Sequence, residues 1–121
     1  MKPSFLIKFL NSFGFAFSGI KYALTTQLNM KIHLIASILV VLLGWYFNLS
    51  KIEWCCITFC IAMVIATELL NTSIELICDF IQPEKHKKIK HIKDISAAAV
   101  LITAIAAIVI AFIIFIPKLF C

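Results

Sequence analysis

Three long apolar segments, at residues 32–49, 52–81 and 95–116, constrain the fold of this chain more than any other feature. An apolar stretch of about 18 residues or more can cross the hydrocarbon core of a bilayer as a helix. The 121-residue chain is 63% hydrophobic and only 14% charged, which excludes an ordinary soluble globular protein. We therefore expect an all-α membrane protein with three transmembrane helices in a single domain over residues 1–121.

Residues 4–25 predict a helix of another kind, because their apolar and polar side chains separate onto two faces. The apolar face carries Phe5, Leu6, Phe9, Leu10, Phe13, Phe17, Ile20 and Leu24. Lys8 and Asn11 lie on the opposite face, where Phe15 is the one aromatic exception. This pattern is typical of an amphipathic helix that lies in the membrane interface.

The net charge of +5 comes from lysine alone, and five lysines fall between residues 85 and 93. A basic cluster can bind nucleic acid, but this one lies between two apolar spans. The positive-inside rule explains it better, so we expect no nucleic-acid partner and place the cluster in the cytoplasm. Pro83 should end the preceding helix, and residues 82–93 are expected to form a polar cytoplasmic loop.

Carboxylates occur in the second apolar segment, where a membrane helix does not ordinarily carry them. At 100° per residue, Glu68, Asn71, Glu75 and Asp79 fall within a stripe about 80° wide on one helical face. An ionisable side chain at the centre of a membrane helix costs about 2.5–3.5 kcal/mol on insertion scales. Stacked oxygen ligands suit a hard divalent cation, and a carboxylate beside it can accept a proton from a substrate hydroxyl. A structural alternative is that these polar side chains hold helices together in an oligomer.

The dipeptide Lys93-Asp94 precedes the third span and also allows two interpretations. In the structural one, Asp94 is a helix N-cap and Lys93 is solvated. In the functional one, Lys93 contacts a phosphate group near a helix N-terminus that favours anions.

The order of these motifs resembles the signature of the prokaryotic diacylglycerol kinase family. The matching strings are Glu68-Leu-Leu-Asn71-Thr-Ser-Ile-Glu75, then Asp79, then Lys93-Asp94-Ile-Ser-Ala-Ala-Ala-Val, with Asn29-Met-Lys31-Ile-His33-Leu and Gly19 upstream. The resemblance implies a small bacterial inner-membrane kinase that uses MgATP to phosphorylate a lipid alcohol. That acceptor would be diacylglycerol, giving phosphatidic acid, or alternatively undecaprenol. It also implies a homotrimer with active sites shared between subunits.

The resemblance assigns roles to individual residues. Glu68 would be the general base that deprotonates the lipid hydroxyl, and Glu75 would ligate Mg²⁺ at the ATP phosphates. The remaining nucleotide-site positions would be Asn71, Asp79, Glu84, His86, Lys93 and Asp94, with Lys8 and Phe15 contributed by the N-terminal helix.

One position departs from the family pattern, which has a metal-binding glutamate where this chain has Gln27. An amide oxygen can still coordinate Mg²⁺, but it brings no charge, so we expect weaker metal binding. This departure leaves open a catalytically weakened family member. A small proton-coupled transporter, in which Glu68 and Glu75 relay protons, is a further alternative.

Overall fold

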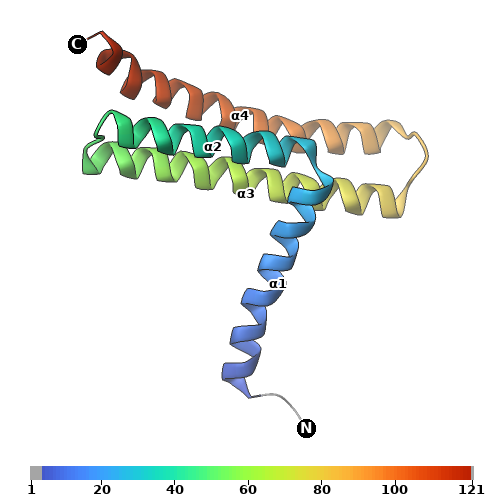
Figure 1. The fold of residues 1–121 in the computed structure, drawn as a ribbon. Helices are drawn as coiled ribbons and strands as arrows, with labels where there is room; N and C mark the ends of the chain where they lie inside the picture. Colours follow the sequence, from blue (N-terminus) through green and yellow to red (C-terminus); the bar gives the residue numbers. More distant parts are fainter. Residues whose placement is uncertain (1–3, 121) are drawn as a thin grey trace.

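The computed structural model describes residues 4–120, which form four helices (Figure 1). These are α1 (Phe5–Thr26), α2 (Leu28–Tyr46), α3 (Lys51–Ile81) and α4 (Lys87–Leu119). Helices α2, α3 and α4 are each long and apolar enough to cross a membrane. The prediction of an all-helical chain with three such helices is therefore confirmed.

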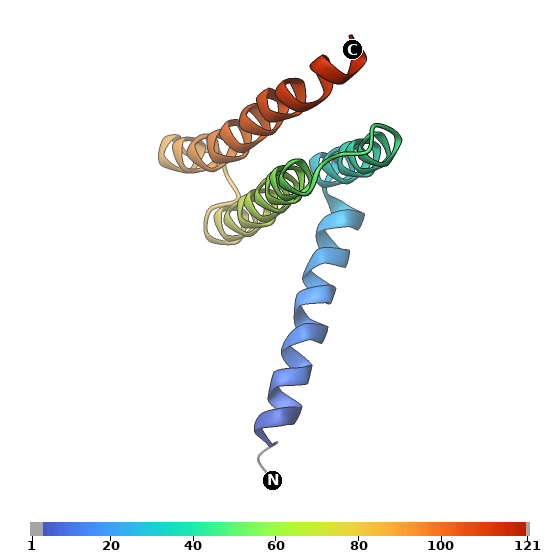
Figure 2. The same ribbon diagram turned by 90° about the vertical axis from the view of Figure 1, so that its left-hand side faces the viewer.

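Helix α3 is the centre of the bundle formed by the three long helices. Both α2 and α4 pack along α3, whereas no Cα atom of α2 lies within 8 Å of a Cα atom of α4 in the described residues. Figure 2, which looks obliquely along the bundle, shows α2 and α4 on different sides of α3. The side chains of α3 therefore have to serve two interfaces at once.

Helix α1 leaves the bundle at a steep angle and projects away from it (Figures 1 and 2). Ala23, near its C-terminal end, is its only buried residue. Along one side, the Phe5 ring stacks on Phe9 with a centroid separation of 6.4 Å, and Phe9 meets Phe13 edge to face at 5.2 Å. All three rings are exposed. A helix across the bundle axis suits the interface position that the sequence predicts for it, and that position stays a prediction.

The turn between α2 and α3 is short, and residues in and beside it determine its conformation. Asn48 has φ 52°, a left-handed conformation that asparagine tolerates better than most residues. Ser50 then begins α3 with a capping box, because its hydroxyl accepts from the Glu53 amide while the Glu53 carboxylate accepts from the Ser50 amide. Helix α2 consequently ends at Tyr46, three residues before the predicted end of the first span.

The connection between α3 and α4 is shorter than the sequence predicted. Only residues 82–86 are non-helical, and α4 begins at Lys87 rather than near residue 95. His86 is its N-cap, with the Nδ1 atom accepting from the Lys88 amide at 3.1 Å. The interpretation of Asp94 as an N-cap is therefore wrong, because Asp94 lies inside the helix. Lysine is a good helix former, so the basic segment extends α4 beyond the apolar span.

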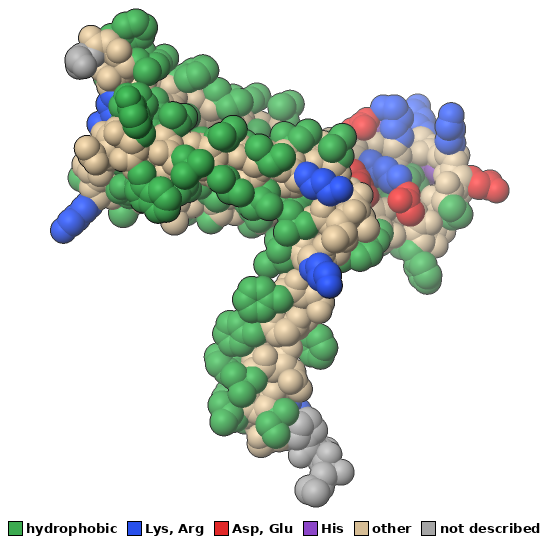
Figure 3. Space-filling view, in the orientation of Figure 1, with side chains coloured by type: hydrophobic (Ala, Val, Ile, Leu, Met, Phe, Trp, Pro, Cys, Tyr) green, Lys and Arg blue, Asp and Glu red, His purple; other side chains and the backbone are tan. Residues whose placement is uncertain are grey.

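The two ends of the bundle differ in composition. We call the end at the α2–α3 connection the turn end and the end at residues 82–86 the loop end. A cluster of buried apolar side chains lies at the turn end, formed by Leu49, Ile57, Ile114 and Phe115. Beside it, Lys118 Nζ lies 3.3 Å from Glu53 Oε1. Figure 3 shows charged side chains gathered mainly at the loop end, with a largely hydrophobic surface between the ends.

Gly44 provides a test of the packing between α2 and α3. A Cβ atom added there would lie 2.6 Å from Cη2 of Trp54 and 3.0 Å from Cδ1 of Leu49. We expect Gly44→Ala to destabilise the protein by about 1–3 kcal/mol, the usual cost of overpacking. Thermal unfolding in detergent micelles measures this change. Gly14→Ala is the control, because nothing lies within 4 Å of a Cβ there, and equal stability of the two variants would contradict the packing described.

Candidate functional site

The predicted polar stripe lies on α3 as expected, because the helix is unbroken from Lys51 to Ile81. Its members become more exposed toward the loop end. Glu68 is 2% exposed and Asn71 5% exposed, Glu75 is half-buried, and the Asp79 side chain is 60% exposed. The stripe therefore runs from the protein interior to the polar end of the bundle.

Two oxygen atoms in the buried part of the stripe lack hydrogen-bond partners within residues 4–120. They are Oε2 of Glu68 and Oδ1 of Asn71. Neighbouring side chains make other hydrogen bonds: Asn71 Nδ2 donates to Glu75 Oε1 at 3.4 Å, and Thr72 Oγ1 donates to the Glu68 carbonyl oxygen at 2.9 Å. An unpaired buried polar group costs about 1–3 kcal/mol, so such atoms point to a ligand or to a function.

His33 of α2 is the side chain that approaches Glu68 from another helix. Its Nε2 atom lies 3.7 Å from Glu68 Oε2, and the imidazole is 20% exposed. In the sequence, His33 stands out only as a member of the family-like string from Asn29 to Leu34. Its proximity to Glu68 depends on how α2 packs against α3, which the sequence pattern did not indicate.

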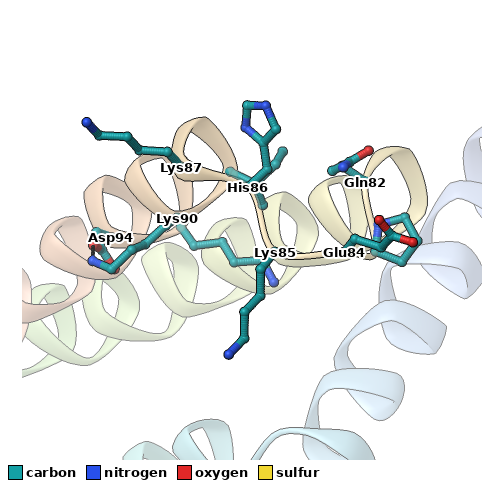
Figure 4. A pocket seen from close by; sticks show the side chains of 10 residues that line it. Gln82, Glu84, Lys85, His86, Lys87, Lys90 and Asp94 are labelled. Carbon is teal, nitrogen blue, oxygen red and sulfur yellow. Dashed lines mark hydrogen bonds and ion pairs between the residues drawn. The ribbon is translucent and has the colours of Figure 1, made fainter.

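A polar groove of about 650 Å³ lies at the loop end, between the end of α3 and the start of α4. It brings together four of the predicted site residues, Glu84, His86, Lys93 and Asp94. Figure 4 shows Lys90 and Asp94 together on the α4 side of this groove and Glu84 at its other side. Four lysines and two carboxylates line it, so it carries a net positive charge suited to an anion.

An ion pair connects the stripe to this groove. Lys93 Nζ lies 2.6 Å from Asp79 Oδ1, so the pair joins α3 to α4 across the connection. Lys90 pairs with Asp94 at the same distance of 2.6 Å, one helical turn apart on α4. Lys93 therefore lies about two turns inside α4, and its position does not place it at the helix N-terminus that the functional interpretation assumed.

The stripe offers oxygen ligands but not a complete metal cage. Among residues 4–120, no three histidine, cysteine or acidic side chains are close enough together to hold a metal ion. The Glu75 carboxylate and the unpartnered Asn71 Oδ1 atom are nevertheless hard oxygen donors on one face of α3. Mg²⁺ usually takes one or two carboxylates together with water and substrate phosphates, so these residues fit it.

Three further predicted residues lie on α1 and in the turn that follows it. Lys8 and Phe15 are exposed on the projecting part of α1, where Phe15 has 75% of its surface accessible. Gln27 forms the turn between α1 and α2, and its Nε2 atom donates to Thr26 Oγ1 at 3.3 Å. Their assignment to the nucleotide site and the metal stays a prediction.

An apolar groove of about 320 Å³ lies on α3 between α2 and α4. It extends from Ile32 and His33 to Ala111, and most of its lining is aliphatic. His33 and Val64 form the part nearest to Glu68, because Val64 precedes Glu68 by one helical turn. The groove therefore brings an apolar surface of the three long helices close to the buried carboxylate.

These features define a small multi-pass membrane protein whose central helix carries a buried carboxylate between an apolar groove and a basic polar groove. The profile of the prokaryotic diacylglycerol kinase family matches residues 14–115, and the chain belongs to that family. It is therefore a lipid kinase, a transferase of the membrane.

Named relatives agree with this assignment. The chain is 38% identical to "Undecaprenol kinase" of Bacillus subtilis over 94% of this chain and 93% of the relative. It is 33% identical to "Diacylglycerol kinase" of Synechocystis over 91% of this chain and 63% of that longer protein. It is 26% identical to "Diacylglycerol kinase" of Escherichia coli K12 over 84% of each chain.

The Lys93–Asp79 pair makes the loop end testable without an activity assay. We expect Asp79→Asn to raise hydrogen–deuterium exchange several-fold at the protected amides that flank the connection, such as those of Gln82 and Lys90, because the connection loses its link between α3 and α4. Lys88→Met is the control, since Lys88 lies beside the connection and its side chain makes no ion pair within residues 4–120. Unchanged exchange in Asp79→Asn would show that the pair does not hold this connection.

Proposed function

We propose that this protein transfers the γ-phosphoryl group of ATP to the hydroxyl group of a membrane lipid, with Mg²⁺. The observation that carries the proposal is the position of Glu68. Its carboxylate is 2% exposed, has one unpartnered oxygen, and lies between the apolar groove and the stripe that leads to the basic groove. A lipid hydroxyl and a nucleotide could therefore meet along this face of α3.

The loop-end groove is the proposed nucleotide site. Its volume of about 650 Å³ lies in the range of small-molecule pockets, and its lysines can neutralise phosphate charge. Lys93 and Asp79 would orient the phosphates toward the stripe, with Asp94, Glu84 and His86 at the edges of the groove. The ion pair at 2.6 Å keeps Lys93 on the side of α4 that faces α3.

Glu75, Asn71 and, in a weaker role, Gln27 are the residues that would hold Mg²⁺. Glu75 supplies a carboxylate and Asn71 a buried amide oxygen without a partner. When bound, the ion would offset the charge on the phosphates during transfer. The sparse protein ligand set agrees with a metal that arrives together with its nucleotide.

Glu68 is the proposed general base. It accepts the proton of the lipid hydroxyl as that oxygen forms its bond to the γ-phosphorus, and the bond from phosphorus to the ADP oxygen breaks. The products are a lipid phosphate and ADP. Because phosphoryl transfer depends mainly on positioning and charge neutralisation, a rigid carboxylate on a packed helix suits this task.

Undecaprenol is the acceptor that we propose first. The relative named undecaprenol kinase shares 38% identity over nearly the full length of both chains, against 33% and 26% for the two diacylglycerol kinases compared above. The apolar groove of aliphatic side chains suits a long hydrocarbon chain. Diacylglycerol is the second candidate, because the matching family profile carries its name.

The proposed enzyme is a homotrimer whose loop end lies on the cytoplasmic side of the membrane. Lys8 and Phe15 are exposed on α1, so they are free to contact the nucleotide site of a neighbouring subunit in a homotrimer. The lysines of the loop end favour the cytoplasmic side of the bacterial inner membrane. With the bundle crossing the membrane, α1 would lie along its cytoplasmic surface with its phenylalanine face toward the lipid.

Glu68→Gln is the direct test of the proposed base. We expect the variant to lose lipid phosphorylation by a factor of about 10² or more, because a positioned base contributes about that much. The assay measures phosphate transfer from ATP in mixed micelles. Glu53→Gln is the matched control at the turn end, where glutamine can still form the capping box. Equal activity of Glu68→Gln and the wild type would exclude Glu68 as the base.

The same assay decides the acceptor when undecaprenol and diacylglycerol are presented side by side. We expect undecaprenol to be phosphorylated with the higher kcat/KM. A preference for diacylglycerol would select the second candidate. No transfer to either lipid by folded protein at saturating Mg²⁺ would favour the catalytically weakened family member.

If Gln27 is a metal ligand, replacing its amide with a carboxylate should strengthen the binding of Mg²⁺. We expect Gln27→Glu to lower the Mg²⁺ concentration needed for half-maximal turnover, because a carboxylate binds the ion more strongly than an amide. Thr25→Glu adds the same charge at an exposed position two residues away and should not change that concentration. If the Mg²⁺ dependence of Gln27→Glu equals that of the wild type, Gln27 is not a metal ligand.

A further inference from the structure

His33 contacts the proposed catalytic face of α3 from outside it. Its Nε2 atom is 3.7 Å from Glu68 Oε2, a carboxylate oxygen without a hydrogen-bond partner in residues 4–120. Hydrogen bonds of this kind measure about 2.7–3.2 Å, so an approach of roughly half an ångström would form one. Within the described residues, no other lysine or histidine side chain lies within 4.0 Å of the Glu68 carboxylate.

The nearest polar groups of α3 make hydrogen bonds within α3. The amide of Asn71 donates to Glu75, and the hydroxyl of Thr72 donates to the backbone of Glu68 itself. A buried carboxylate in apolar surroundings needs a donor to hold it in one orientation. His33 is the donor that α2 places beside Glu68 Oε2.

His33 also lines the apolar groove, with 20% of its side chain exposed. The imidazole therefore lies between the groove and the carboxylate, at the point where a lipid hydroxyl would have to arrive. A residue there can fix the carboxylate without itself receiving the proton that Glu68 removes.

We propose that His33 is a positioning residue for Glu68. The Nε2–H group of its imidazole donates to Glu68 Oε2, and this fixes the carboxylate so that its other oxygen faces the lipid hydroxyl. The inference rests on the proposed role of Glu68 as general base. It adds a residue on α2 to a site that otherwise lies along α3 and the start of α4.

Kinetics of two substitutions test the donor. His33→Leu keeps the side-chain size and removes the N–H group, whereas His33→Gln retains an amide N–H near the position of Nε2. We expect kcat for the lipid to fall at least tenfold in His33→Leu, with KM for MgATP unchanged, and to recover largely in His33→Gln. His91→Leu is the control and should behave as the wild type, because His91 is exposed on α4 and lines neither groove.

A thermal measurement tests the same contact without activity. We expect His33→Leu to lower the Tm in detergent when Glu68 is present, and to lower it by less than half as much in the Glu68→Gln background. Equal Tm changes in both backgrounds would show that the side chains are not coupled and would overturn the proposal. Coupling without any fall in kcat would reduce the contact to helix packing and would overturn the positioning role.

These outcomes are distinct from failure of the proposed function. If the wild type transfers phosphate and Glu68→Gln does not, the lipid kinase proposal stands, whatever His33→Leu shows. If His33→Gln and His33→Leu lose kcat equally, a hydrogen-bond donor at this position is not what Glu68 requires, and the proposal for His33 is wrong.

Discussion

The fold depends on one constraint, which is that α3 has to carry ionisable side chains through a membrane. A carboxylate at the bilayer centre is costly, so such groups face the inside of a bundle or a polar cavity. The stripe meets this requirement because the exposed fraction of its residues rises along the helix, from 2% at Glu68 to 60% at the side chain of Asp79. Because α2 and α4 pack on α3 and not on each other, the same helix holds the bundle together and presents the polar face. Helix α3 therefore carries both the packing contacts of the bundle and the polar residues of the candidate site.

Where sequence reasoning succeeded, the information was local to one helix. Long apolar segments require helices in a membrane, since no other open structure satisfies the backbone there. The stripe from Glu68 to Asp79 could be predicted because helical periodicity alone brings its members to one face. The capping box at Ser50 and Glu53 is equally local, and it places the start of α3 within one residue of the prediction.

The sequence-based predictions failed in two situations. In one, the feature depends on how two helices pack; in the other, two local sequence signals favour different structures. The lysine-rich segment before Lys93 looked like a polar loop, but lysine favours helix and His86 supplies a cap, so α4 begins at Lys87. The contact between His33 and Glu68 joins two helices, as does the pair between Lys93 and Asp79. Neither pairing follows from the periodicity of one segment, because each depends on the rotation of a second helix about its own axis.

The two ends of the bundle separate the main apolar packing from the proposed functional site. The turn end has the buried apolar cluster around Ile57 and Phe115, the close approach of α2 to Trp54 at Gly44, and the partly buried pair between Glu53 and Lys118. The other half of α3 carries Glu68 and Asn71, whose unpartnered buried oxygens destabilise the folded chain. Groups that are unsatisfied in the resting protein are the ones that a substrate hydroxyl, a cation or a phosphate can satisfy on binding. Packing at the turn end offsets their cost, so the chain can keep a polar face within a helix long and apolar enough to span a membrane.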